Sequence, residues 1–173
     1  MENKLAAKIN QAIVEEFERR VMGESIPRIK KCLSLLNEEE VWHRPNENVV
    51  SVGNLILHLC GNARQWILSG VGGRIDHRDR DSEFEETGPI AKDQLIRQMD
   101  QLVEEMRKVL LPLKPENLLE KRPVQIYEES VLSILVHVIE HFSYHTGQIT
   151  FITKWLKNVD TQYYEGIDLN KKE

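Results

Sequence analysis

Residues 130–156 read SVLSILVHVIEHFSYHTGQITFITKWL, an apolar run with histidines at positions 137, 141 and 145. In an α-helix, four residues rise about 6 Å and turn about 40° past one revolution, so neighbouring histidines of this series project from one face. His141 and His145 can therefore bind one ion, whereas His137 and His145 lie about 12 Å apart along the axis. The run predicts a metal-holding helix that needs at least one further ligand from another helix.

Apolar residues at three- and four-residue spacing predict three further helices, over residues 3–36, 52–70 and 91–111. Pro27 removes an amide donor inside the first of them. Two interpretations stay open there: the helix bends, or a second segment starts with Ser25 as its N-cap.

Two long connections separate the predicted helices. Residues 70–89 contain paired glycines and a run of charges from Arg74 to Asp81. This composition predicts a solvated loop with internal ion pairs. If the loop lies near one end of a bundle, it could also contact a substrate. In the second connection, residues 124–127 read as briefly extended but too short to make a sheet. A loop as long as the first can run the length of a bundle, so the helix after it can be parallel to the helix before it.

The fold class expected is all-α: one four-helix bundle with two long connections, forming a single domain over residues 1–173. The length and composition, with 40% hydrophobic and 29% charged residues, suit one such domain. The polar tail, from about residue 165 to 173, is expected to be weakly ordered.

Charge and hydropathy limit the classes of function that the protein can have. The net charge of -5 is a poor match for a phosphate backbone, so we expect no nucleic-acid partner. No apolar run reaches the ~18 residues that cross a bilayer, and the N-terminus is charged and amphipathic, so we expect a cytoplasmic protein without a membrane partner. Cys32 and Cys60 are too few and too far apart for a disulfide framework or a Cys-x-x-Cys site, so both are expected to be buried.

His58 lies on the inward stripe of helix 52–70. Together with His141 and His145 it would supply three imidazoles between two packed helices and leave one coordination position vacant, as in reactive zinc sites. Imidazole sites suit several ions, so zinc or nickel is expected, with iron or manganese as alternatives. Other residues near the ligand turns are candidates for the second shell or for holding substrate: His137, Asn62, Gln65, Tyr144 and Gln148.

Other interpretations stay open at this point. A lone histidine on an apolar stripe is usually a hydrogen-bonded core residue, and two histidines four residues apart also occur by chance, so a bundle without metal is an alternative. His43 and His77 are assigned to the surface. No glutamate follows His141, which disfavours the metalloprotease helix, and Cys60 points about 200° away from His58, which disfavours a Cys-His nucleophile.

Two motifs resemble the DinB superfamily, the DinB/YfiT-like metalloenzymes. One is the stretch Ser51-Val-Gly-Asn-Leu-Ile-Leu-His58 with the following Leu-Cys-Gly-Asn62. The other is His137-Val-Ile-Glu-His141-Phe-Ser-Tyr-His145-Thr-Gly-Gln148. The loop Arg78-Asp-Arg-Asp-Ser-Glu-Phe84 is similar to one branch of that superfamily.

The resemblance implies an up-down-down-up bundle, commonly a homodimer, that holds a nickel or zinc ion on His58, His141 and His145. Similar proteins include thiol-dependent S-transferases and a thiol-dependent isomerase, but a fold does not determine an activity. We therefore expect an enzyme of the S-transferase or hydrolase type, in which the ion activates a low-molecular-weight thiol or water for attack on a small-molecule electrophile. The alternative is a non-catalytic, metal-stabilised binding module, for example in a stress response.

Overall fold

The first helical segment runs without interruption from Glu2 to Leu35 in the computed structural model, which describes residues 2–172. It consists of α1 (Glu2–Phe17), the π-helical η1 (Glu18–Ser25) and α2 (Ile26–Leu35). The Ile26 N–H donates to the Val21 carbonyl, five residues back, immediately before Pro27. Pro27, which has no N–H to donate, thus follows directly on a π-helical turn, and the helix neither stops nor restarts there.

The second helical segment follows a short helix and a loop. Asn37 and Glu40 form a capping box on that short helix, α3 (Glu38–Val41). The segment itself comprises α4 (Val52–Ala63) and the π-helical η2 (Arg64–Val71), and the Ser51 side chain accepts from the Asn54 N–H at its start. The predicted helix over 52–70 and its serine cap are therefore confirmed.

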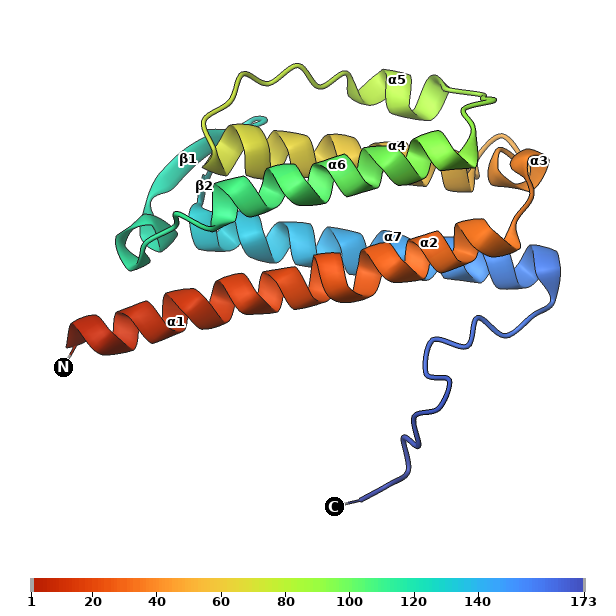
Figure 1. Cartoon of the computed structure of the whole chain (residues 1–173). Coiled ribbons are helices and arrows are strands. Elements are labelled where there is room, and N and C mark those ends of the chain that lie inside the picture. The colour runs from red at the N-terminus through yellow and green to blue at the C-terminus, as the bar shows by residue number, and fades with distance from the viewer. Residues whose placement is uncertain (1, 173) are drawn as a thin grey trace.

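Residues 72–91, which we call the strap, return across the outside of α4 (Figure 1). The prediction of a plain loop is wrong in one respect, because α5 (Arg80–Glu85) forms within it, with Asp79 accepting from the Ser82 N–H at its start. Beyond the strap, α6 (Lys92–Leu110) runs in the same direction as α4 (Figure 1). The parallel course of these two helices agrees with the expectation from the length of the connection.

A β-hairpin follows α6 and the 3-10 helix η3 (Pro115–Leu119). Its strands, β1 (Lys121–Val124) and β2 (Tyr127–Ser130), pair antiparallel from Lys121↔Ser130 to Val124↔Tyr127. The prediction that residues 124–127 make no sheet is therefore wrong. Gln125 adopts a φ of 54°, which closes a tight turn that the sequence did not signal.

The last helix, α7 (Val131–Lys157), starts where predicted, with the Ser130 side chain accepting from the Ser133 N–H. It contacts both α2 and α4, and α6 in turn contacts α4 and α2. The four long helical segments thus lie side by side around one core, whose fully buried side chains include Phe17, Leu33, Leu59, Leu102 and Phe142. Cys32 and Cys60 are buried, as expected.

The ends of the molecule differ in how they pack. After α7, the Tyr163 hydroxyl lies 2.7 Å from Thr150 Oγ1, which attaches this part of the tail to α7. The weak order expected beyond residue 165 stays a prediction, and Glu173 lies outside the described residues.

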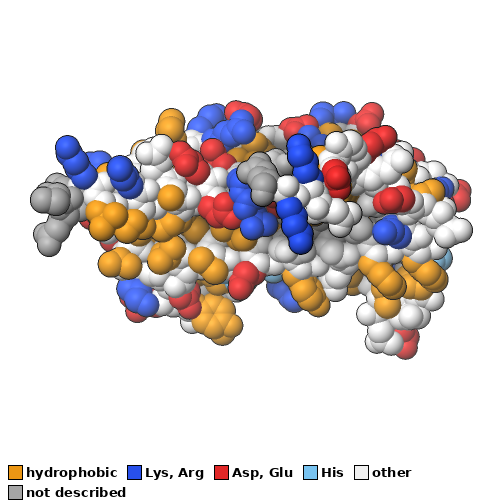
Figure 2. Space-filling model, turned by 90° about the horizontal axis from the view of Figure 1, so that it is seen from below, with side chains coloured by type: hydrophobic (Ala, Val, Ile, Leu, Met, Phe, Trp, Pro, Cys, Tyr) orange, Lys and Arg blue, Asp and Glu red, His pale blue; other side chains and the backbone are white. Residues whose placement is uncertain are grey.

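At the other end, hydrophobic side chains gather on the half of the lower face nearer the N-terminus (Figure 2), and Leu5 and Ile9 of α1 are 62% and 49% exposed.

None of the helices within residues 2–172 combines the length and the apolar character needed to span a bilayer.

Candidate metal centre

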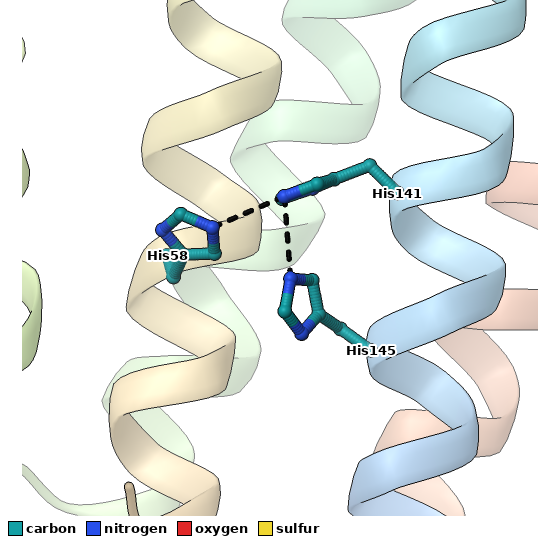
Figure 3. A group of neighbouring side chains, drawn as sticks. All are labelled: His58, His141 and His145. Carbon is teal, nitrogen blue, oxygen red and sulfur yellow. Dashed lines mark hydrogen bonds between the residues drawn. The ribbon is translucent and has the colours of Figure 1, made fainter.

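The packing of α4 against α7 brings three imidazoles together (Figure 3). His58 Nε2 lies 3.0 Å from His141 Nε2, and His145 Nε2 lies 3.2 Å from the same atom. One nitrogen from each ring lies within 4.8 Å of the others. His141 and His145 share one face of α7, and α4 supplies the third ring, so the arrangement follows the geometry expected from the sequence.

The outer nitrogens of two of these rings determine which inner nitrogens carry lone pairs. His58 Nδ1 lies 2.9 Å from Glu83 Oε2, and His145 Nδ1 lies 2.7 Å from Gln148 Oε1. A carboxylate or amide oxygen only accepts, so both Nδ1 atoms carry the proton and both Nε2 atoms carry a lone pair.

These two lone pairs face the same atom, His141 Nε2. One N–H at that atom could donate to only one of them, and the buried His141 Nδ1 has no hydrogen-bond partner among the described residues. A cation would satisfy all three inner nitrogens at once. Tetrahedral zinc at the usual Zn–N length of ~2.0–2.1 Å separates its ligand nitrogens by about 3.3 Å, close to the 3.0 and 3.2 Å separations from His141 Nε2, and the remaining pair lies within 4.8 Å. The residues therefore fit a divalent ion.

Burial keeps the imidazoles of α7 neutral. Loss of hydration, aided by the neighbouring rings of His145 and His58, lowers the pKa of His141 to about 3. The pKa of His145 and that of His137 are also lowered, mainly by burial. Neutral imidazole is the form that binds metal, so these rings are ready to act as ligands near neutral pH.

A buried ion pair from the strap covers the outer side of His58. Arg78 Nε donates to Glu83 Oε1 at 2.7 Å, and Arg78 Nη2 donates to Glu83 Oε2 at 2.9 Å. Burial by itself would raise the pKa of Glu83, but the hydrogen bonds from Arg78 and His58 outweigh it and lower that pKa. The prediction that the Arg74–Asp81 run is wholly solvated is therefore wrong at Arg78, whose side chain is only 4% exposed.

The five residues proposed from sequence for the second shell have different surroundings. Gln148 contacts His145 directly, and the Tyr144 ring stands edge-on to His145 with centroids 5.0 Å apart. His137 lies one turn before His141 in α7, where it stacks on Trp66 and accepts a 3.3 Å hydrogen bond from Asn62 Nδ2. Gln65 is linked to the histidines through Arg78, which donates to its Oε1 at 2.8 Å.

Sequence reasoning missed Arg78 and Glu83, and it assigned His43 and His77 correctly to the surface. One signal could have pointed to Glu83. Gly61 lies inside a helix, three residues after His58 and on the same face, and such a glycine often marks a close approach by another group.

A groove of about 750 Å³ begins one helical turn from the histidines, between α7 and the loop before α4. Leu55 and Gln148, which are three residues from His58 and His145 respectively, are among the residues that line it. Among the described residues, those that line it carry no formal charge: Pro45, Asn48, Val49, Val50, Leu55, Tyr144, Gly147, Gln148, Phe151, Ile152 and Trp155.

Solved structures similar to this one define its class. A DinB-like protein of Bacillus subtilis, YjoA, superposes with a TM-score of 0.62 at 15% identity, over 86% of this chain and 94% of that one. A DinB-like protein of Bacillus cereus gives a TM-score of 0.59 at 17% identity, over 82% and 91% of the two chains. The fold is therefore DinB-like, as the sequence motifs predicted.

The chain belongs to the DUF1572 family, described as proteins of unknown function, whose model matches residues 9–168. No curated protein is significantly similar to it in sequence.

Proposed function

We propose that this protein is a divalent-metal-dependent enzyme that activates a low-molecular-weight thiol or water for attack on a small electrophile. The observation that carries the proposal is the convergence of His58, His141 and His145, with two of their lone pairs directed at the third ring. Zinc or nickel is the ion that we propose, because neutral imidazoles suit both.

The number of ligands favours a reactive site over a structural one. Within residues 2–172, no fourth histidine, cysteine, aspartate or glutamate joins the cluster. Structural zinc sites are usually closed by four protein ligands, whereas three ligands with an open position are typical of catalytic sites. When bound, the ion would lower the pKa of a thiol or water and so supply a nucleophile at neutral pH.

The side chains around the cluster divide the remaining tasks. Gln148 and Glu83 hold the His145 and His58 rings by their Nδ1 atoms. Asn62 Oδ1 and Trp66 Nε1, beside His137, are buried without a hydrogen-bond partner among the described residues. The uncharged groove beside Gln148 suits an apolar part of a small-molecule substrate.

Two measurements on protein without a histidine tag test the proposal. Elemental analysis should find close to one zinc or nickel per chain, and His145→Ala should lose it, whereas His77→Ala should retain it. The metal-loaded protein should also show turnover in a panel of thiols and electrophiles, and His145→Ala should lose that rate while keeping its helical circular dichroism.

The results separate the alternatives. Metal binding without turnover anywhere in the panel would favour the non-catalytic, metal-stabilised module. Absence of zinc and nickel from the purified protein, together with no binding when either ion is added, would refute both.

We further propose that the four long helical segments form an up-down-down-up bundle that assembles as a homodimer. The parallel course of α4 and α6 supports the topology (Figure 1). The exposed Leu5 and Ile9 on α1, together with Val136 on α7 at 45% exposure, supply apolar surface for a second copy. Light scattering after size exclusion should give twice the mass of the chain, and Ile9→Asp should shift it towards the monomer.

A further inference from the structure

The strap crosses α4 and brings two charged side chains to His58 that are 20 to 25 residues away in sequence. The side chains of Arg78, Glu83 and His58 are 4%, 9% and 8% exposed. Charged groups are rarely buried to this extent unless they are paired, and here the pair is made with both oxygens of the carboxylate.

We infer that Glu83, held in place by Arg78, is a positioning residue that fixes the tautomer and the ring orientation of His58 for metal binding. Glu83 Oε2 accepts from His58 Nδ1, which directs the lone pair of Nε2 towards His141. Carboxylate partners of this kind orient metal-binding histidines and make them stronger ligands. The inference rests on the metal site proposed above, but the state of the His58 ring can be tested without any metal.

Two groups near His58 Nδ1 favour opposite tautomers of the ring. Arg78 Nη2, at 3.1 Å, can only donate to Nδ1, whereas Glu83 Oε2, at 2.9 Å, can only accept from it. Arg78 is already paired with the carboxylate through Nε and Nη2, and the shorter contact of Nδ1 is the one with Glu83, so we assign the Nδ1 proton to the hydrogen bond with Glu83. Arg78 also donates to Gln65 Oε1, and Gln125 of the hairpin donates to the same oxygen at 2.7 Å. The strap is thus linked to the hairpin as well as to α4.

Gly61 is the position in α4 that lets Glu83 approach. A Cβ at this residue would lie 1.8 Å from Glu83 Oε1, 2.8 Å from its Cδ and 3.1 Å from Arg78 Nε. A methyl group there must displace the carboxylate. Alanine is otherwise preferred to glycine inside a helix, so Gly61→Ala should favour the helix while it disturbs the strap.

Zinc affinity is the first test, measured by competition with a chromophoric chelator at fixed pH. Glu83→Ala should bind zinc about 10- to 100-fold more weakly than the wild type. Glu83→Gln keeps one oxygen that can accept from Nδ1 and should lose less. Gly61→Ala should weaken binding in the same direction as Glu83→Ala. Glu85→Ala, on the exposed side of α5, is the matched control and should bind as the wild type does.

The tautomer of His58 is the second test, read from nitrogen NMR shifts of the metal-free protein. The wild type should show His58 protonated at Nδ1, and Glu83→Ala should move the proton to Nε2 or populate both forms. A role in folding alone would not move this signal.

The two tests separate the possible failures. Unchanged zinc affinity and an unchanged Nδ1 proton in folded Glu83→Ala would overturn the inference. If Glu83→Ala does not fold, the same pair of results in Gly61→Ala would overturn it. A wild type that binds no zinc would refute the proposed function, and the NMR comparison would still decide whether Glu83 sets the tautomer.

Discussion

Acidification should destabilise the metal-free protein through His141. Burial lowers the pKa of this ring to about 3 in the folded chain, whereas in the unfolded chain it returns to its ordinary value of 6.5. Between these values the unfolded state binds the proton and the folded state does not. Stability therefore rises with pH across this window and is lost as the pH falls from about 6.5 towards 3.

The size of the stability loss depends on how far the pH lies below the ordinary pKa of histidine. At pH 4.5, two units below 6.5, a fully buried ring would lower the free energy of unfolding by about 2.7 kcal/mol, at 1.36 kcal/mol per unit. The His141 ring is partly exposed, so solvent screening reduces the expected loss to about 2 kcal/mol. His145, whose pKa is lowered as well, adds to the loss in the same direction.

Urea denaturation of chelator-treated protein at pH 7 and pH 4.5 measures this loss. Protonation of carboxylates also contributes, so the comparison is made with His141→Gln, which retains the carboxylates but not the imidazole. The wild type should lose about 2 kcal/mol more than the variant between the two pH values. His77→Gln, at an exposed histidine, should behave as the wild type. Equal losses in the wild type and His141→Gln would refute the assignment of a buried, neutral His141.

Three further outcomes follow from packing, capping and burial. Leu102→Ala, at a side chain with 0% exposure, should lower the free energy of unfolding by about 3 kcal/mol in urea titrations. Ser130→Ala removes the acceptor for the Ser133 N–H at the start of α7 and should cost about 1 kcal/mol in the same assay. Burial raises the pKa of Cys60 to about 11, so iodoacetamide at pH 8 should leave this thiol unmodified until the protein is unfolded. Rapid alkylation of Cys60 in the native protein would contradict its burial.

The helices and the inward histidines were predictable because the information for both is local. Apolar spacing places Leu95, Met99 and Leu102 on one face of α6, and the structure buries all three. The same spacing places His141 and His145 together and turns His58 inward. The serine caps at the starts of α4 and α7 were readable for the same reason, since a cap involves residues only three apart.

The sequence-based predictions failed where a residue's contact partner lies far away in sequence or where the backbone geometry is unusual. The hairpin depends on a turn that places Gln125, rather than a glycine, in the left-handed region. The apolar spacing that predicted the helix over residues 3–36 does not distinguish the π-helical turns before Pro27 from an α-helix. Arg78 and Glu83 looked like any solvated charges, because only the path of the strap over α4 buries them.

The amino-acid sequence was therefore enough to predict which segments are helical, which face of each is apolar, and which histidines point inward, because side-chain periodicity along a helix needs only neighbouring residues. From sequence the meeting of His58 with His141 and His145 was a proposal, which the packing of α4 against α7 bears out, whereas the buried Arg78–Glu83 pair that supports His58 from outside is seen only in the folded chain. Those contacts depend on how α4, α7 and the strap pack, and packing joins residues whose separation along the chain carries no signal of their proximity.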